Sequence, residues 1–297
     1  MNLQYVKYAL EIARTGSISK AAENLSVAQP NLSRAVKELE TQMGIAIFER
    51  TRTGMTVTPE GERLLSAGER ILRDVSELEG MFDGESAPRE VISVVAPRST
   101  GLSYAFASFC RSLPADGHFD ITYREAGSTD ALSAVERGEC ALGIIRYAAH
   151  FGNYYTDLAT QKGLISEVIS EFSPVVVAGL GSALAGKDAL TAADLKGFCE
   201  IGHPDALRLD TVEESTDTRL RLTVTDRATR YELLASDPTA YQISAPLPAS
   251  VAVRLGLIQR PLAGAEPYRD VLIYPKNHRL TPIEESFRAA LRESMKS

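Results

Sequence analysis

The sequence predicts an α/β protein with a mostly helical N-terminal head, a long helix after it, and a C-terminal α/β domain of two subdomains. Three observations support this prediction. Before residue 83, apolar side chains recur at helical spacing. From residue 91 onward, short strand-like apolar runs alternate with helical segments. Between them, "DGESAPRE" is small, charged and proline-containing, as linkers are. We therefore expect three parts, at residues 1–58, 59–90 and 91–297.

The head begins with apolar residues whose spacing predicts three short helices, at residues 3–13, 18–25 and 30–43. Gly16 and Gly44 each follow the last apolar position of a helix, where glycine readily adopts a left-handed conformation. Ser17 is a good N-cap for the second helix, and Pro30 suits the first turn of the third. Two helices joined by a short turn, the second one longer, are typical of a helix-turn-helix.

The outer face of the third helix is polar but not a mixture of acids and lysines, since it carries Gln29, Asn31, Ser33, Arg34 and Lys37. Amides can pair with adenine, arginine can form two hydrogen bonds with guanine, and serine or lysine can bind phosphate. A helix face that reads DNA and an ordinary solvated amphipathic helix both fit this stretch alone.

A hairpin is predicted next, from strand-like residues 45–50 and 55–58 around the turn Thr53-Gly54. Its arm carries Arg50 and Arg52, which could lie on phosphates beside a helix in the major groove. Thr58 and Pro59 then begin a long helix. That helix has apolar and small residues at heptad spacing, namely Gly61, Leu64, Gly68, Ile71, Val75, Leu78 and Phe82. This seam is expected to pair with a second copy; the alternative is that it packs on its own chain.

These residues together resemble the LysR-type transcriptional regulators, through "GSISKAAENLSVAQPNLSRAVKELETQMGIAIFERTRTGMTVTPEG". The resemblance implies a regulator that binds double-stranded DNA, forms a homodimer or dimer of dimers through antiparallel linker helices, and senses a small molecule with its C-terminal part. Ala28 departs from the family, which often has a hydroxyl residue there. The residues predicted to contact DNA are Ser17, Gln29, Pro30, Asn31, Ser33, Arg34, Lys37, Arg50 and Arg52.

The C-terminal part shows strand-like runs at residues 91–96, 119–125, 141–146, 174–179, 198–202, 221–225, 240–244, 256–261 and 268–275. Their alternation with helical segments predicts parallel α/β sheets in two subdomains, with the last strand and the helix at 282–295 returning to the first subdomain. The family resemblance implies a periplasmic-binding-protein-like effector domain with a ligand cleft between its halves.

Ligands of such sheets bind beyond the carboxyl ends of strands, near helix N-termini. The loop after the first strand holds Arg98, Ser99 and Thr100, which could bind a carboxylate together with backbone N–H groups. Ser128 and His203 occupy comparable loops, so these five residues are the predicted effector-binding set. Each of them alone could instead be a cap or a solvent-facing residue. The family that this chain resembles often has an acidic residue at the position of Ala141, and its absence here is a departure from the family pattern in the cleft.

Composition narrows the function further. The net charge is −7, but residues 1–58 hold seven Lys/Arg and five Asp/Glu, so a weakly basic head precedes an acidic body. The three cysteines lie far apart, and no zinc, nucleophile or phosphate-loop motif is present, so we expect no metal, no cofactor and no catalytic residues. The sequence has no apolar segment long enough to span a bilayer, so we expect no association with a membrane and a cytoplasmic location. The rival function is a solute-binding or ligand-sensing protein that does not read DNA sequence by itself.

Overall fold

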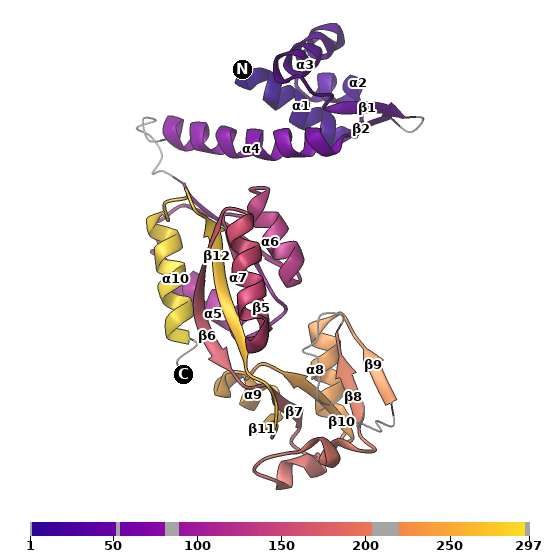
Figure 1. Cartoon of the computed structure of the whole chain (residues 1–297), viewed down its shortest axis with the longest axis vertical. Coiled ribbons are helices and arrows are strands. Elements are labelled where there is room, and N and C mark those ends of the chain that lie inside the picture. Colours follow the sequence, from indigo (N-terminus) through magenta and orange to yellow (C-terminus); the bar gives the residue numbers. More distant parts are fainter. Residues whose placement is uncertain (1, 52–53, 81–88, 204–219, 295–297) are drawn as a thin grey trace. The chain divides into compact units, whose positions relative to one another are not determined.

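A computed structural model describes residues 2–51, 54–80, 89–203 and 220–294 (Figure 1). The chain divides into two compact units, the first made mainly of the residues up to 90 and the second mainly of the residues from 91 onward. Each unit has a hydrophobic core of its own.

Three helices open the first unit: α1 (Leu3–Thr15), α2 (Ile18–Asn24) and α3 (Gln29–Met43). Their ends follow from the capping residues. The Ser17 side chain accepts a hydrogen bond from the Lys20 N–H and so begins α2. Gly16 and Gly44 end α1 and α3 at φ of 64° and 68°, a conformation that glycine adopts without strain. The predicted bounds of all three helices therefore agree with the structure to within two residues.

The predicted hairpin is present as β1 (Phe48–Thr51) and β2 (Gly54–Val57), which pair antiparallel. Its first strand starts later than predicted because the preceding residues are held by α3: the Glu40 carboxylate accepts hydrogen bonds from the N–H groups of Ile47 and Phe48 at 2.7 and 3.2 Å. Thr58 caps the next helix as expected, since its hydroxyl accepts from the Gly61 N–H at 2.9 Å.

The long helix α4 (Pro59–Gly80) corrects the interpretation of the heptad seam. A Cβ atom at Gly61 would collide with the backbone of Ile47, and one at Gly68 would collide with the Val6 side chain. Leu65, which lies outside the seam, is 6% exposed in the same core. The first half of the seam therefore packs on its own chain, which was the alternative interpretation, whereas Leu78 near the other end is 56% exposed. Phe82 lies outside the described residues.

The second unit contains two five-stranded sheets, one in each subdomain (Figure 1). The sheet of the first subdomain has the order β4-β3-β5-β12-β6. Helices α6 and α7 pack on one face, and α5 and α10 cover the other. Between α5 and α10, the ring centroids of Phe109 and Phe287 are 5.2 Å apart. The elements are β3 (Glu90–Ala96), α5 (Thr100–Ser112), β4 (Phe119–Glu125), α6 (Ser128–Glu136), β5 (Leu142–Ala148), α7 (Gly152–Gln161), β6 (Leu164–Phe172), β12 (Tyr268–Pro275) and α10 (Pro282–Ser294).

The sheet of the second subdomain has the order β11-β7-β10-β8-β9. Leu234 of α8 and Val251 of α9 are buried in a core that this sheet shares with both helices. The elements are β7 (Val175–Gly179), β8 (Cys199–Gly202), β9 (Leu220–Thr223), α8 (Arg227–Ser236), β10 (Ala240–Ser244), α9 (Ala249–Arg254) and β11 (Leu257–Pro261). Three short 3-10 helices complete the second unit: η1 (Ala149–Phe151), η2 (Ala183–Gly186) and η3 (Ala192–Leu195).

The prediction of parallel sheets is confirmed only in part, because both sheets also contain antiparallel pairs. β3 and β5 are parallel, as are β8 and its neighbours β9 and β10. β12 pairs antiparallel with β5 and β6, and β7 pairs antiparallel with β10 and β11. The strands in antiparallel pairs lie where the chain crosses between the subdomains: β7 follows β6 into the second sheet, and β12 follows β11 back into the first. The return of β12 and α10 to the first subdomain was predicted. Strand β6 and helices α7 and α9 were not predicted.

Candidate functional site

The first candidate site is the outer face of α3. Its predicted DNA-contacting residues are all exposed, while Leu32, Val36 and Leu39 on the opposite face are buried. Gln29 accepts a hydrogen bond from the Ser19 hydroxyl at 3.3 Å, which links α3 to α2. The exposed residues are Gln29, Pro30, Asn31, Ser33, Arg34 and Lys37. In the part of the head that the structure describes, this face therefore offers exposed amide, hydroxyl and cationic groups.

Three other predictions fall around this face. Arg50 is exposed on β1, and Arg52 lies outside the described residues. The Ser17 hydroxyl oxygen already accepts a hydrogen bond from the Lys20 N–H, so a contact from Ser17 to a DNA phosphate would use a hydroxyl that also caps α2. Ala28 is the N-cap of α3 and makes no side-chain cap, as its departure from the family pattern implied.

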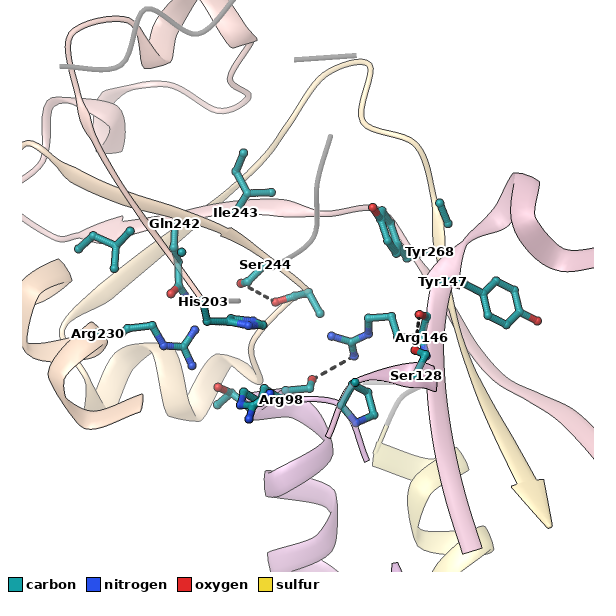
Figure 2. A pocket seen from close by; sticks show the side chains of 18 of the residues that line it. Arg98, Ser128, Arg146, Tyr147, His203, Arg230, Gln242, Ile243, Ser244 and Tyr268 are labelled. Atoms are coloured by element: carbon teal, nitrogen blue, oxygen red, sulfur yellow. Dashed lines mark hydrogen bonds between the residues drawn. The ribbon is translucent and has the colours of Figure 1, made fainter. Parts of the chain in front are cut away.

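The second candidate site is a cavity of about 280 Å³ between the two subdomains of the second unit (Figure 2). All five predicted effector-binding residues line it, namely Arg98, Ser99, Thr100, Ser128 and His203. They come together because each one follows the carboxyl end of a strand, where the loops of parallel strands meet. None of the described residues that line the cavity is an aspartate or a glutamate.

On the wall from the first subdomain, the start of α5 faces the cavity. Ser99 is the N-cap residue and is 6% exposed, but its hydroxyl does not cap the helix. It instead accepts a hydrogen bond from the Arg146 guanidinium at 3.1 Å. The first N–H groups of α5 therefore have no side-chain cap, and such groups attract anions.

Arg146 extends from β5 into the same wall, and its charge is already neutralised. Its Nε and Nη2 atoms each donate to the Asp270 carboxylate at 2.7 Å, and the two side chains are 8% and 1% exposed. The guanidinium also lies 4.8 Å from the centre of the Phe172 ring. Ser128 holds the backbone of Arg146 through hydrogen bonds of 2.8 and 2.9 Å. This pair fixes the shape of the wall rather than adding net charge.

On the opposite wall, Arg230 enters from α8, and Figure 2 shows its side chain pointing toward the cavity near His203. Arg230 is only 7% exposed. Its Nε has no hydrogen-bond partner, and no carboxylate among the described residues forms an ion pair with it. Burial lowers the pKa of the guanidinium, and this effect outweighs Tyr231 and Glu125, which raise the pKa, while the charges of Arg227 and Arg98 lower it further. Gln242 lines this wall too and is 3% exposed, with an unpartnered Oε1 atom.

Three side-chain contacts among the described residues connect the subdomains beside the cavity. The hydroxyls of Thr100 on α5 and Tyr231 on α8 share a hydrogen bond. Arg227 donates to Ser103 on α5 at 2.7 Å and forms an ion pair with Glu125 of β4. Helix α8 therefore carries both a cavity residue and the groups that attach it to the first subdomain.

Sequence reasoning missed Arg146, Arg230 and Gln242 because none of them follows a strand end. A signal existed for two of them. Arg146 interrupts the buried run of β5, where a charged side chain needs a partner. Arg230 lies four residues before Leu234, and both are on the buried face of α8.

Residues 3–62 match the bacterial regulatory helix-turn-helix proteins of the LysR family, and residues 85–296 match the LysR substrate binding domain. The chain belongs to the LysR family. Among its curated relatives, the uncharacterized HTH-type regulator YcgK of Bacillus subtilis is 31% identical over 147 residues, 49% of this chain and 45% of that protein. GltR of the same species is 36% identical over 100 residues, 34% of each chain. The LysR-family chain thus matches less than half the length of these relatives.

Solved structures show the same fold over nearly the whole chain. ArgP from Mycobacterium tuberculosis gives a TM-score of 0.70 at 17% identity, covering 98% of this chain and 96% of that one. Full-length OxyR from Pseudomonas aeruginosa gives 0.65 at 17% identity, covering 98% of both. CbnR in complex with its target DNA gives 0.60 at 19% identity, covering 99% of this chain and 100% of that one. Among the described helices, none has the length and hydropathy of a transmembrane span.

Proposed function

We propose that this chain is a cytoplasmic, sequence-specific transcriptional regulator that binds double-stranded DNA and responds to a small organic anion. Residues 1–58 act as the DNA-binding domain, residues 59–90 as linker and dimerisation segment, and residues 91–297 as the effector-binding domain. The relatives named above carry the names of transcriptional regulators, and one related structure contains target DNA. These likenesses support the proposal together with the geometry of the two sites.

One observation carries the DNA-binding part of the proposal. In α3, a buried apolar stripe fixes the helix on the head while the opposite face exposes amide, hydroxyl and guanidinium groups from its first turn onward. A helix-turn-helix places the N-terminal part of its second helix against base edges. Gln29 and Arg34 therefore read bases, whereas Ser33, Lys37 and Arg50 bind phosphates and position the helix.

The effector is a carboxylate or a similar anion. The cavity is lined by three arginines and the uncapped start of α5, and no acidic side chain among the described residues lines it. Its volume, at about 280 Å³, lies near the lower end of the range for small-molecule sites, so the effector is a small metabolite-sized anion. Binding changes DNA occupancy only if the anion favours one arrangement of the protein, and such coupling is typically ~1–3 kcal/mol.

The test is selection of genomic DNA fragments by the purified full-length protein at ~150 mM salt, where non-specific charge attraction is already weakened. We expect enrichment of an interrupted palindrome. Gln29→Ala and Arg34→Ala should each weaken specific binding by about 1–3 kcal/mol, with a smaller effect on random DNA.

Lys7→Ala is the matched control, because Lys7 is an exposed cation of the same head on α1 and is not part of the α3 face. It should leave the enriched sequence unchanged. Equal losses on specific and random DNA for Gln29→Ala would refute base reading by that residue. If no sequence is enriched at any salt concentration, the proposal fails, and the ligand-sensing protein without DNA reading becomes the better description.

A further inference from the structure

We propose that Arg230, and not Arg146, is the receptor for the acid group of the effector, and that this one guanidinium limits the preferred effector to a monoanion. The inference rests on the proposed effector function of the cavity and names the charge class of its ligand. It follows from which arginines already have counter-charges in the structure.

Arg146 cannot supply net charge to a ligand, since Asp270 holds it through two hydrogen bonds of 2.7 Å and both side chains are buried. An anion placed against Arg146 would also meet the negative charge of Asp270 at short range, and the two effects largely cancel. Arg227, one turn before Arg230 on α8, is likewise paired with a carboxylate, that of Glu125.

Arg230 differs from both of these arginines. It is 7% exposed, its Nε has no acceptor, and no described carboxylate forms an ion pair with it. Taking a cation out of water without a counter-charge is costly, so a protein keeps such a group only where something offsets the cost. In this cavity an anionic ligand can do so, and the direction of the pKa change of Arg230 agrees with an uncompensated buried cation.

The uncapped N-terminus of α5 is a second, independent attraction for the same acid group. Thr100, at the start of α5, shares a hydrogen bond with Tyr231, the residue that follows Arg230. A carboxylate beside Thr100 therefore meets helix N–H groups from one subdomain and a guanidinium from the other. Arg98 also lines the cavity, but its side chain is half-exposed, so water solvates its charge with or without a ligand. Among the described residues that line the cavity, Arg230 is the buried cation without an ion-pair partner, so one negative charge on the ligand balances it.

The experiment compares two substitutions on the same helix in the full-length protein, Arg230→Met and Arg227→Met. Melting temperatures are measured at low salt with no added ligand. We expect Arg230→Met to melt higher than the wild type, because it removes a buried uncompensated charge and keeps the side-chain length. Arg227→Met should melt lower, because it leaves Glu125 without its partner. A merely structural role for Arg230 predicts a lower melting temperature for both, and that result would overturn the proposal.

The second arm adds acetate, acetamide or malonate at equal ionic strength. Acetate should raise the melting temperature of the wild type by about 2–4 °C for each kcal/mol of binding, and acetamide, which is of similar size but neutral, should not. Malonate should gain nothing over acetate. Arg230→Met should lose the acetate effect, and Arg227→Met should keep it.

An acetate effect that survives Arg230→Met, the absence of any carboxylate-specific effect in the wild type, or a larger effect of malonate that is lost in Arg230→Met would each overturn the assignment. The DNA selection described above does not depend on Arg230. If the melting experiments contradict the role of Arg230 but the DNA selection still enriches a palindrome, Arg230 is rejected as the receptor and the proposed regulator function stands.

Discussion

Replacing Asp270 by asparagine tests whether the Arg146 pair is a structural element of the effector domain. The substitution keeps the size of the side chain and one hydrogen-bond acceptor, but it removes the counter-charge of a guanidinium whose side chain is 8% exposed. Removing one partner of a buried pair typically costs about 3–5 kcal/mol. Because asparagine can still accept one of the two 2.7 Å hydrogen bonds, we expect a loss near the lower end, about 3 kcal/mol.

The assay is urea unfolding followed by far-UV circular dichroism, since the chain contains no tryptophan. Glu200→Gln is the matched control: it makes the same acid-to-amide change in the ion pair with Arg221, whose side chain is 63% exposed. A surface pair of this kind contributes at most about 1 kcal/mol. The double substitution Arg146→Met with Asp270→Leu should recover much of the loss. If Asp270→Asn costs no more than Glu200→Gln, the reasoning about this buried pair is wrong.

Three further predictions concern the first unit. Gly61→Ala should destabilise the protein by about 1–3 kcal/mol despite the better helix propensity of alanine, because the new Cβ meets backbone atoms of Ile47; Gly68→Ala, which meets only the Val6 side chain, should cost less in the same urea assay. The hydrogen bonds from Arg14 and Asn24 lower the pKa of Glu11 from 4.5 to about 2. Its stabilising effect is therefore complete above pH 4.5 and lost as the pH falls toward 2, so the stability difference between wild type and Glu11→Gln should vanish over that interval; a difference that stays constant would contradict the assignment. Ile71→Glu combined with Val75→Glu should yield a monomer by light scattering, and an unchanged oligomer would reject α4 as the pairing helix.

The head could be predicted closely from sequence because its signals are local. Ser17, Gly16 and Gly44 mark helix ends by hydrogen bonding and backbone conformation within a few residues. The heptad seam misled in part, because spacing alone cannot tell a partner helix from the chain's own core. The collision at Gly61 involves Ile47, which is 14 positions earlier in the sequence, so only the fold reveals it.

The effector domain was less predictable, for two physical reasons. Strand β6 is an edge strand in which apolar and polar residues alternate in pairs, and its sequence shows no continuous buried run. The direction of β12 depends on where the chain returns after the second subdomain, which no local pattern encodes. The five predicted cavity residues did come together because they follow strand ends. Arg230 did not stand out, because an arginine in a helix usually points to water. What marks it as unusual is that it is buried and that no carboxylate among the described residues pairs with it.

The packing of α4 into the head has a mechanical consequence. The first half of the helix packs closely on the head, through Leu65 in the core and the close approaches of Gly61 to Ile47 and of Gly68 to Val6. The helix and the head therefore move as one rigid body. At 1.5 Å per residue, its 22 residues span about 33 Å. That length is close to one helical turn of DNA, about 34 Å. If two copies pair through the outer half of α4, a tilt between the two helices changes the spacing between the two α3 helices.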